Sequence, residues 1–196
     1  MSACAKPVRD GRDPSHRKVG WVLAVLLYWA SGTTVAGDAD PGVAKEYELK
    51  AAYLFNFAKF VRWPATALPD ADTPLVVGIF GSDRVAVALD ALTKGRSVNG
   101  HPVQVKVVSD ATNVAGLHVL YLDRAKDAGL SQIAPVFSSN GLLTVGESDA
   151  FARAGGMIRL VVEANRLQFE INAGAAQRAG LSLSSQLLTL ARKVQR

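Results

Sequence analysis

Cysteine is almost absent from this chain of 196 residues, because Cys4 is the single one. It lies in a segment that we expect to be removed, so the remainder has no thiol and forms no intramolecular disulfide bond. Histidine is nearly as scarce. His16 lies in the same segment, and His101 and His118 have no cysteine and no carboxylate at the spacing of metal ligands. We therefore expect no metal site and no cofactor.

Motifs for catalysis and for nucleic-acid binding are also missing. The chain has neither a nucleophile elbow nor a P-loop. The serines near residue 184 have no positioned base nearby in sequence, so helix capping is their expected role, and a hydrolase stays open only if the fold brings a nucleophile and a base together. No run of Lys and Arg is interleaved with aromatic residues, as nucleic-acid binding would require. These absences argue against an enzyme and against a protein that binds nucleic acid.

The N-terminus has the pattern of a secretory signal peptide. Five basic and two acidic residues precede an apolar run at residues 21–30, and small residues continue to Ala36. The apolar run is shorter than the roughly 20 residues that span a bilayer, although an uncleaved anchor is the alternative. We expect a signal peptide at 1–36, a loose segment at 37–44 and one domain at 45–196, which is exported and soluble. Removal of the leader lowers the net charge from +5 to +2.

The mature chain begins with a predicted helix that is amphipathic. Apolar residues recur at helical spacing from Tyr47 to Val61, while Glu46, Lys50, Asn56 and Lys59 take the other faces, and Pro64 is expected to end the helix. Its apolar stripe must pack against another surface.

Beyond this helix, apolar runs alternate with helical patterns. Strands are predicted at 75–80, 103–108, 119–122 and 142–145, with a helix at 82–92. The alternation predicts an α/β fold whose mainly parallel sheet carries helices on both faces. The segments MIRLVVE and RLQFEI, joined through Ala164-Asn165, predict a β-hairpin that gives the sheet an antiparallel edge. A final helix is expected from Ser184 to about Val194, with Ser182 or Ser184 as its cap.

One loop has the composition of an anion site. Gly81, Ser82 and Asp83 lie between a predicted strand and helix, where backbone N–H groups can receive a negatively charged ligand. The alternative is that Gly81 makes a tight turn and Asp83 caps the helix. Asp123 and Glu147 follow later strands and are candidates by position, because ligands of parallel sheets bind beyond the carboxyl ends of the strands.

Two segments resemble one known family. They are AAYLFNFAKFVRWP at residues 51–64, and GGMIRLVVEANRLQFEINAGAAQRAGLSLSSQLLTLARKV at residues 155–194. Together with the phrase SVNGHPVQV between them, they are similar to the YfiR-like (YfiR/HmsC-like) family of small secreted bacterial proteins. This resemblance implies a periplasmic regulator that represses a membrane-bound diguanylate cyclase, and so acts in cyclic di-GMP signalling through the periplasmic domain of that enzyme. The alternative is a free-standing periplasmic protein that binds a small molecule. The resemblance further implies a homodimer, and we expect its interface on the apolar first helix, with Tyr47, Phe55 and Trp63 as candidates.

The resemblance also implies a ligand pocket. In the family, an arginine in the RWP setting and the acidic residue of the FEIN-like strand line a pocket for small effectors, such as an aromatic amino acid or a nucleotide. The matching positions here are Arg62 and Glu170. A histidine of that pocket is replaced by Ser184, and the disulfide bonds of several relatives are missing. The alternative role for Arg62 and Glu170 is a structural ion pair that ties the first helix to the hairpin.

Overall fold

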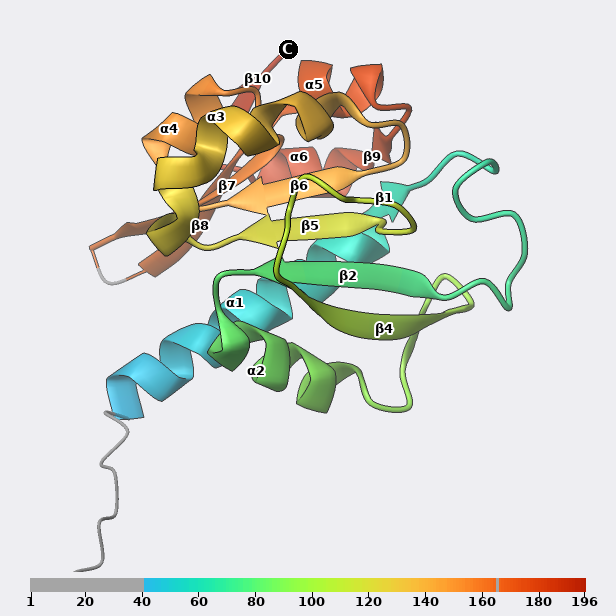
Figure 1. Ribbon diagram of the computed structural model, residues 1–196, viewed down its shortest axis with the longest axis horizontal. Coiled ribbons are helices and arrows are strands. Elements are labelled where there is room, and N and C mark those ends of the chain that lie inside the picture. The colour runs from blue at the N-terminus through green and yellow to red at the C-terminus, as the bar shows by residue number, and fades with distance from the viewer. Residues whose placement is uncertain (1–40, 165) are drawn as a thin grey trace, which may run out of the picture. The chain divides into compact units, whose positions relative to one another are not determined.

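One mostly parallel sheet organises the part of the chain that the structure describes (Figure 1). Its central strand, β2 (Leu75–Phe80), has parallel neighbours on both sides, β4 (His101–Val108) and β5 (Val119–Leu122). Two further parallel strands, β6 (Leu143–Gly146) and β7 (Ile158–Glu163), extend the sheet beyond β5. The full order is β10-β8-β7-β6-β5-β2-β4-β3. The predicted α/β class and all four predicted parallel strands are confirmed.

The structure is a computed structural model that describes residues 41–164 and 166–196. The predicted signal peptide lies outside these residues. The prediction of a loose segment at 37–44 was wrong for its second half, because helix α1 (Pro41–Phe60) already begins at Pro41. Proline suits the first turn of a helix, since its fixed φ is helical and its missing N–H would have no partner there.

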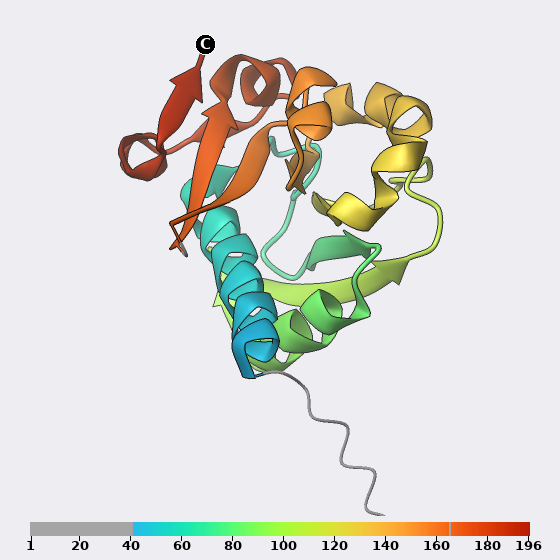
Figure 2. The same cartoon turned by 90° about the vertical axis from the view of Figure 1, so that its left-hand side faces the viewer.

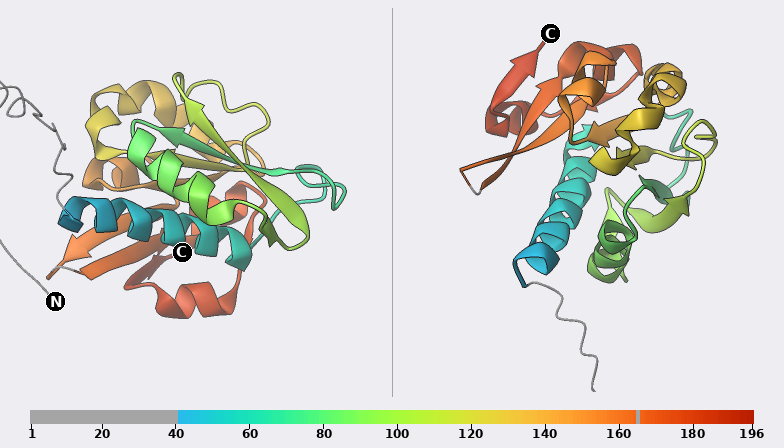
Figure 3. Two further views of the ribbon diagram at one scale, coloured as in Figure 1. Left: turned by 90° about the horizontal axis from the view of Figure 1, so that it is seen from below. Right: turned by 60° about the vertical axis from the view of Figure 1, so that its left-hand side comes forward.

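Helices cover both faces of the sheet, as predicted (Figure 2). The larger apolar cluster joins the sheet to the long helices α1 and α2 and to two short C-terminal ones, and the smaller cluster lies under a series of short helices on the other face. Besides α1, the helices on the face with the larger cluster are α2 (Asp83–Thr93), α5 (Ala173–Arg178) and α6 (Ser185–Leu190). The short helices on the other face are η1 (Arg124–Gly129), α3 (Leu130–Ile133), η2 (Ala134–Ser138) and α4 (Asp149–Arg153). In Figure 3, α1 and α2 lie side by side.

Helix α1 ends before the predicted position. It stops at Phe60 instead of Pro64, because the next two residues form strand β1 (Val61–Arg62), which pairs antiparallel with β9 (Ser182–Leu183). Its apolar stripe faces the core of its own domain. Lys50, which was expected on a solvent face, is buried at 5% exposure. More of the surface of this helix is therefore buried than its sequence pattern indicates.

The C-terminal hairpin forms as predicted, but it is not the edge of the sheet. Strands β7 and β8 (Arg166–Asn172) pair antiparallel up to Glu163 and Arg166, and Ala164 in the turn has a φ of 47°. Outside β8 lies β10 (Lys193–Gln195), parallel to it. The final helix, α6, ends at Leu190, so Val194 lies on a strand and the prediction of a helix to that residue was wrong.

Candidate ligand pocket

The β1–β9 ribbon brings together two of the residues predicted to bind a ligand. Arg62 pairs in register with Ser182, and the backbone N–H of Ser184 donates to the carbonyl oxygen of Phe60 at 2.9 Å. These backbone contacts fix the end of α1 against the start of α6. Arg62 and Ser184, which are 122 positions apart in sequence, therefore lie at one site.

A hollow of about 620 Å³ opens beside this ribbon. Arg62 and Lys59 provide its two cations, and hydroxyl and amide groups surround them. The residues that line it are Lys59, Phe60, Val61, Arg62, Asn99, Ser182, Leu183, Ser184 and Ser185. No carboxylate is among these described residues. Two cations without a neighbouring acid favour a ligand with a carboxylate or phosphate group, which a guanidinium binds through two parallel hydrogen bonds.

Ser184 has a structural role in addition to its place in the hollow. Its hydroxyl oxygen accepts a hydrogen bond from the Leu187 N–H at 3.2 Å and caps α6, which confirms one of the two expected caps. A hydroxyl that accepts still carries a hydrogen that it can donate. The loss of the family's histidine at this position therefore leaves a polar group in place.

Asn99 and Lys59 were missed as lining residues by the sequence analysis. Strands β3 (Ser97–Val98) and β4 are joined by Asn99 and Gly100, with φ values of 53° and 94°. Positive φ at both positions is typical of a type I′ hairpin turn, for which Asn-Gly is the strongest sequence signal. That signal was present in SVNGHPV, but only the fold shows that the turn lies at the end of α1.

A second, smaller hollow of about 200 Å³ is also lined by Arg62, together with Trp63 and His101. The indole N–H of Trp63 donates to the backbone oxygen of His118 at 3.3 Å. The His118 ring connects the same loop to the sheet, since its Nδ1 accepts from the Val76 N–H and its Nε2 faces the Ala67 oxygen, both at 3.0 Å. These contacts hold the segment after Arg62 against strand β2.

The contacts of His118 also define its protonation state. Because the Val76 N–H donates to Nδ1, the ring hydrogen is on Nε2 and is donated to Ala67. Burial lowers the pKa of His118 below its ordinary value; the hydrogen bond to Ala67 opposes this effect, and the nearby His101 adds to it. His118 is thus a neutral structural residue.

Glu170 does not belong to this pocket. It accepts hydrogen bonds from Arg159 at 2.8 and 3.2 Å, and Arg192 lies 3.2 Å from its other oxygen. Burial alone would raise the pKa of Glu170, but these arginines lower it below its ordinary value. The expected Arg62–Glu170 ion pair is not among the contacts of residues 45–164 and 166–196. That alternative was wrong about the partner, because Arg159 on β7 and Arg192 just before β10 pair with Glu170 instead.

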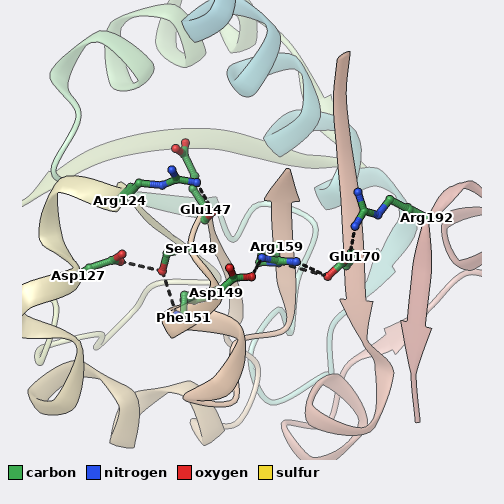
Figure 4. A network of polar contacts seen from close by, with 9 residues as sticks. All are labelled: Arg124, Asp127, Glu147, Ser148, Asp149, Phe151, Arg159, Glu170 and Arg192. Carbon is green, nitrogen blue, oxygen red and sulfur yellow. Dashed lines mark hydrogen bonds and ion pairs between the residues drawn. The ribbon is translucent and has the colours of Figure 1, made fainter. Parts of the chain in front are cut away.

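The Glu170 contacts are part of a larger charge network at the carboxyl ends of the strands, which Figure 4 shows in part. Glu147, Ser148 and Asp149, which directly follow β6, connect the parts of this network. Glu147 lies 2.7 Å from Lys50 and accepts from the Tyr121 hydroxyl, Ser148 donates to Asp127 at 2.9 Å, and Asp149 pairs with Arg159. Below, "the charge network" means Glu46, Lys50, Tyr121, Asp127, Glu147, Ser148, Asp149, Arg159, Glu163, Glu170 and Arg192.

Lys50 is the most buried charge of this network. Burial disfavours its charged form, yet the hydrogen bonds that it donates to Glu147 and Glu46 outweigh this effect and raise the pKa of Lys50 above its ordinary value. Burial and the charge of Glu147 likewise raise the pKa of Tyr121. Glu147 was a ligand-binding candidate by position alone, and in the structure it forms an ion pair with Lys50 instead.

The loop proposed as an anion site has local structural roles. Ser82 caps α2 by accepting from the Val85 N–H at 3.4 Å, so the capping alternative holds with Ser82 in place of Asp83. Gly81 has a φ of 96°, and a Cβ there would lie 2.6 Å from Cγ of Lys126. Asp123 caps η1 by accepting from the Ala125 N–H at 2.9 Å. A side chain of the protein already lies against this loop.

The three residues expected at a homodimer interface lie in different environments. Phe55 belongs to the core at 6% exposure, with the Lys59 ammonium 4.3 Å from its ring centroid. Tyr47 is partly buried, and Arg84 lies over its ring at 5.4 Å. Trp63 is also partly buried; it packs against the larger apolar cluster and donates to the His118 oxygen. Phe55 is therefore unsuited to contact a partner, because the fold already covers it.

Two classes of site are not found among the described residues. No group of three or more His, Cys, Asp or Glu side chains there is arranged to hold a metal ion. None of the helices in that part of the chain has the length and apolar character needed to cross a membrane.

A model of the YfiR/HmsC-like family matches residues 47–192, which include the whole lining of the pocket and most of the chain. The structural comparison adds only distant similarities. A conserved domain protein from Vibrio cholerae O1 biovar El Tor has a TM-score of 0.47 at 13% identity, with 74% of this chain and 60% of that chain covered. The ABC domain in complex with L-Trp from Streptococcus pneumonia has a TM-score of 0.42 at 13% identity, with 61% and 55% covered. This chain spans less than two thirds of either structure.

Proposed function

This chain belongs to the YfiR/HmsC-like family, which is a family of periplasmic regulators, and we propose that it represses a membrane-bound diguanylate cyclase. The observation that carries the proposal is the family match over residues 47–192. In the proposed mechanism, the protein binds the periplasmic domain of the cyclase and has a higher affinity for its inactive state. Repression then equals the difference between the two affinities, because a ligand shifts an equilibrium only by its differential binding.

The hollow beside Arg62 is the proposed control point of this repression. It lies where α1, β9 and α6 meet, so a ligand there contacts both ends of the domain sequence. A small anionic effector held by Arg62 and Lys59 would stabilise one arrangement of these elements. We propose that the effector changes the affinity of the protein for the cyclase by this route.

Capture from native membranes tests the proposed partner. The tagged protein, expressed with its leader and purified from the periplasm, is incubated with solubilised membranes of the source bacterium, and the bound proteins are identified by mass spectrometry. We expect enrichment of an inner-membrane protein with a cytoplasmic cyclase domain, whose activity falls when the protein is added. A cyclase that is present in the membranes but neither captured nor inhibited would contradict the proposal.

A second candidate function follows from the pocket alone. The cationic hollow of about 620 Å³ has the volume of a small-molecule site, so the protein is also a candidate for a free-standing periplasmic binding protein without a cyclase partner. The two functions differ in their partners: the second predicts a small ligand bound at Arg62 and no enzyme captured from the membrane.

A further inference from the structure

The chain contains two Asn-Gly pairs, Asn99-Gly100 and Asn140-Gly141. An asparagine followed by glycine is open to deamidation, because glycine has no side chain to shield its backbone nitrogen from the preceding amide carbon. Both asparagines are exposed, and the two glycines have positive φ values of 94° and 73°. The sequence signal is therefore the same at the two positions, and only their surroundings differ.

Gly141 is held in place by its neighbours. It is buried, and its N–H donates to the backbone oxygen of Ala179 at 2.8 Å. A Cβ at this position would lie only 2.7 Å from Cβ of Ala67, so the backbone there is closely packed. Before it can attack Asn140, the Gly141 nitrogen must lose its hydrogen bond and leave this packed position.

Gly100 is under neither of these constraints. It is exposed, and within residues 41–164 and 166–196 its N–H has no backbone acceptor. A Cβ there would have the Ala71 side chain as its nearest neighbour, at 4.0 Å. The hairpin itself is held by two residue pairs between β3 and β4, and one of them contains Pro102, which has no N–H to donate. Local opening of this exposed turn therefore costs little free energy.

We propose that Asn99 is a site of spontaneous deamidation, and that the carboxylate formed there neutralises the cationic hollow beside Arg62. Asn99 lines this hollow together with Arg62 and Lys59, whereas Asn140 does not. The two cations stabilise the negative charge that develops on the amide during the attack, and they pair with the carboxylate of the product. The effect on an anionic effector rests on the proposed function of the hollow; the modification itself does not.

The reaction needs only solvent water as its co-reactant. The Gly100 nitrogen gives up its proton and forms a bond to Cγ of Asn99, while the Cγ–Nδ2 bond breaks and Nδ2 takes up a proton and leaves as ammonia. Water then opens the resulting succinimide ring at one of its two carbonyl carbons. Opening at Cγ gives aspartate, and the turn is kept because Asp-Gly also suits a type I′ hairpin. Opening at the other carbon gives isoaspartate, whose main chain runs through Cγ.

Peptide mass spectrometry tests the modification, with the second Asn-Gly pair as an internal reference. Trypsin cleaves after Lys and Arg, so Asn99 lies on the peptide 97–106 and Asn140 on the peptide 127–153. The purified native protein is incubated in mildly alkaline buffer, which favours loss of the proton from the attacking nitrogen. We expect deamidation of 97–106 to be about tenfold faster than that of 127–153, because the Gly141 N–H must first lose a hydrogen bond.

The same chain unfolded in guanidinium chloride is the control for the folded structure. Without the fold, we expect the two pairs to react at similar rates, since each is then an asparagine followed by an unshielded glycine. Native rates that are equal, or slower at Asn99, would overturn the proposal. A preference for Asn99 that persists undiminished in the unfolded chain would also overturn it, because neighbouring residues and not the structure would then set the rate.

A matched pair of substitutions tests the consequence for the hollow. Asn99→Asp creates the aspartate product directly, and Asn140→Asp adds the same charge outside the hollow. We expect inorganic phosphate to raise the melting temperature of the wild-type protein and of Asn140→Asp, and most of this shift to be lost in Asn99→Asp. An equal shift in all three proteins would overturn the neutralisation. If phosphate shifts none of them, the proposed anion site is wrong, and the peptide measurement still decides whether Asn99 deamidates.

Discussion

The pocket at the β1–β9 ribbon and the charge network differ in where their charges find partners. In the network, Lys50 lies between Glu46 and Glu147, and Glu170 lies between two arginines. In the pocket, Lys59 and Arg62 stand among hydroxyl and amide groups, without a carboxylate in the described lining. A paired charge mainly stabilises the fold, whereas a charge beside a hollow without a partner is suited to bind a ligand. Residue type alone does not distinguish the two cases, since Arg62 of the pocket and Glu170 of the network were both candidate ligand-binding residues from sequence.

The largest expected effect is on stability, from breaking the network at its most buried charge. Lys50→Ala leaves Glu147, which also accepts from the Tyr121 hydroxyl, without its cation, and removal of one partner from a buried pair costs roughly 3 kcal/mol. We expect urea unfolding to show a loss of this size. The control is Lys45→Ala, an exposed lysine of the same helix, for which we expect little change. Equal effects in the two variants would mean that the Lys50–Glu147 contact does not stabilise the protein.

A smaller effect is expected from acid at His118, which holds the loop next to the pocket. The folded protein lowers the pKa of His118, so the unfolded chain binds the proton first as the pH falls. The stability is therefore complete above about pH 6.5 and declines as the pH falls from there toward the lowered pKa. Thermal unfolding measured over this range should show the decline.

Two substitutions distinguish this titration from general acid sensitivity. His118→Gln removes the titrating ring, and we expect a flatter profile at a lower overall stability. His101→Gln is the control for loss of an imidazole elsewhere in the domain, because the His101 ring faces the Thr73 oxygen at 2.9 Å and not the backbone of Val76 or Ala67. A profile unchanged by His118→Gln would show that another group governs the decline.

The smallest change in stability, and the largest in binding, is expected at Arg62. It is exposed and contributes little to the core, so Arg62→Ala should alter the free energy of unfolding by no more than about 0.5 kcal/mol. Inorganic phosphate should raise the melting temperature of the wild-type protein and have no such effect on the variant. Arg166→Ala, at an exposed arginine of β8, should respond as the wild type does. If Arg62→Ala instead unfolds, Arg62 stabilises the fold as the residues of the charge network do, and the distinction between the pocket and the network fails.

Local patterns were sufficient for most elements of the fold. The alternation of apolar runs predicted the parallel strands, and the short Ala164-Asn165 connection predicted the hairpin, because these signals depend on neighbours in sequence. The errors lie where distant segments pair. Val61 and Arg62 leave the helix because β9 pairs with them, and Val194 joins a strand because the edge of β8 is available.

The candidate site was predictable residue by residue but not as an arrangement. Position after a strand indicated Glu147, and similarity to the family indicated Arg62, Glu170 and Ser184. The fold then kept Arg62 and Ser184 together and paired Glu170 elsewhere. Asn99 carried a turn signal but no sign of where that turn would lie.

By itself, the sequence determined the α/β class and the family, because the first depends on residues close together in the chain and the second on a pattern shared along its length. Only the tertiary structure decided which charges are neutralised inside the protein and which remain beside a hollow. That choice depends on contacts that local sequence does not define. Lys50 meets the loop after β6 and Arg62 meets β9 although these segments are far apart in the chain, and Glu170 meets Arg159 of β7 and Arg192 just before β10 because these segments lie beside β8.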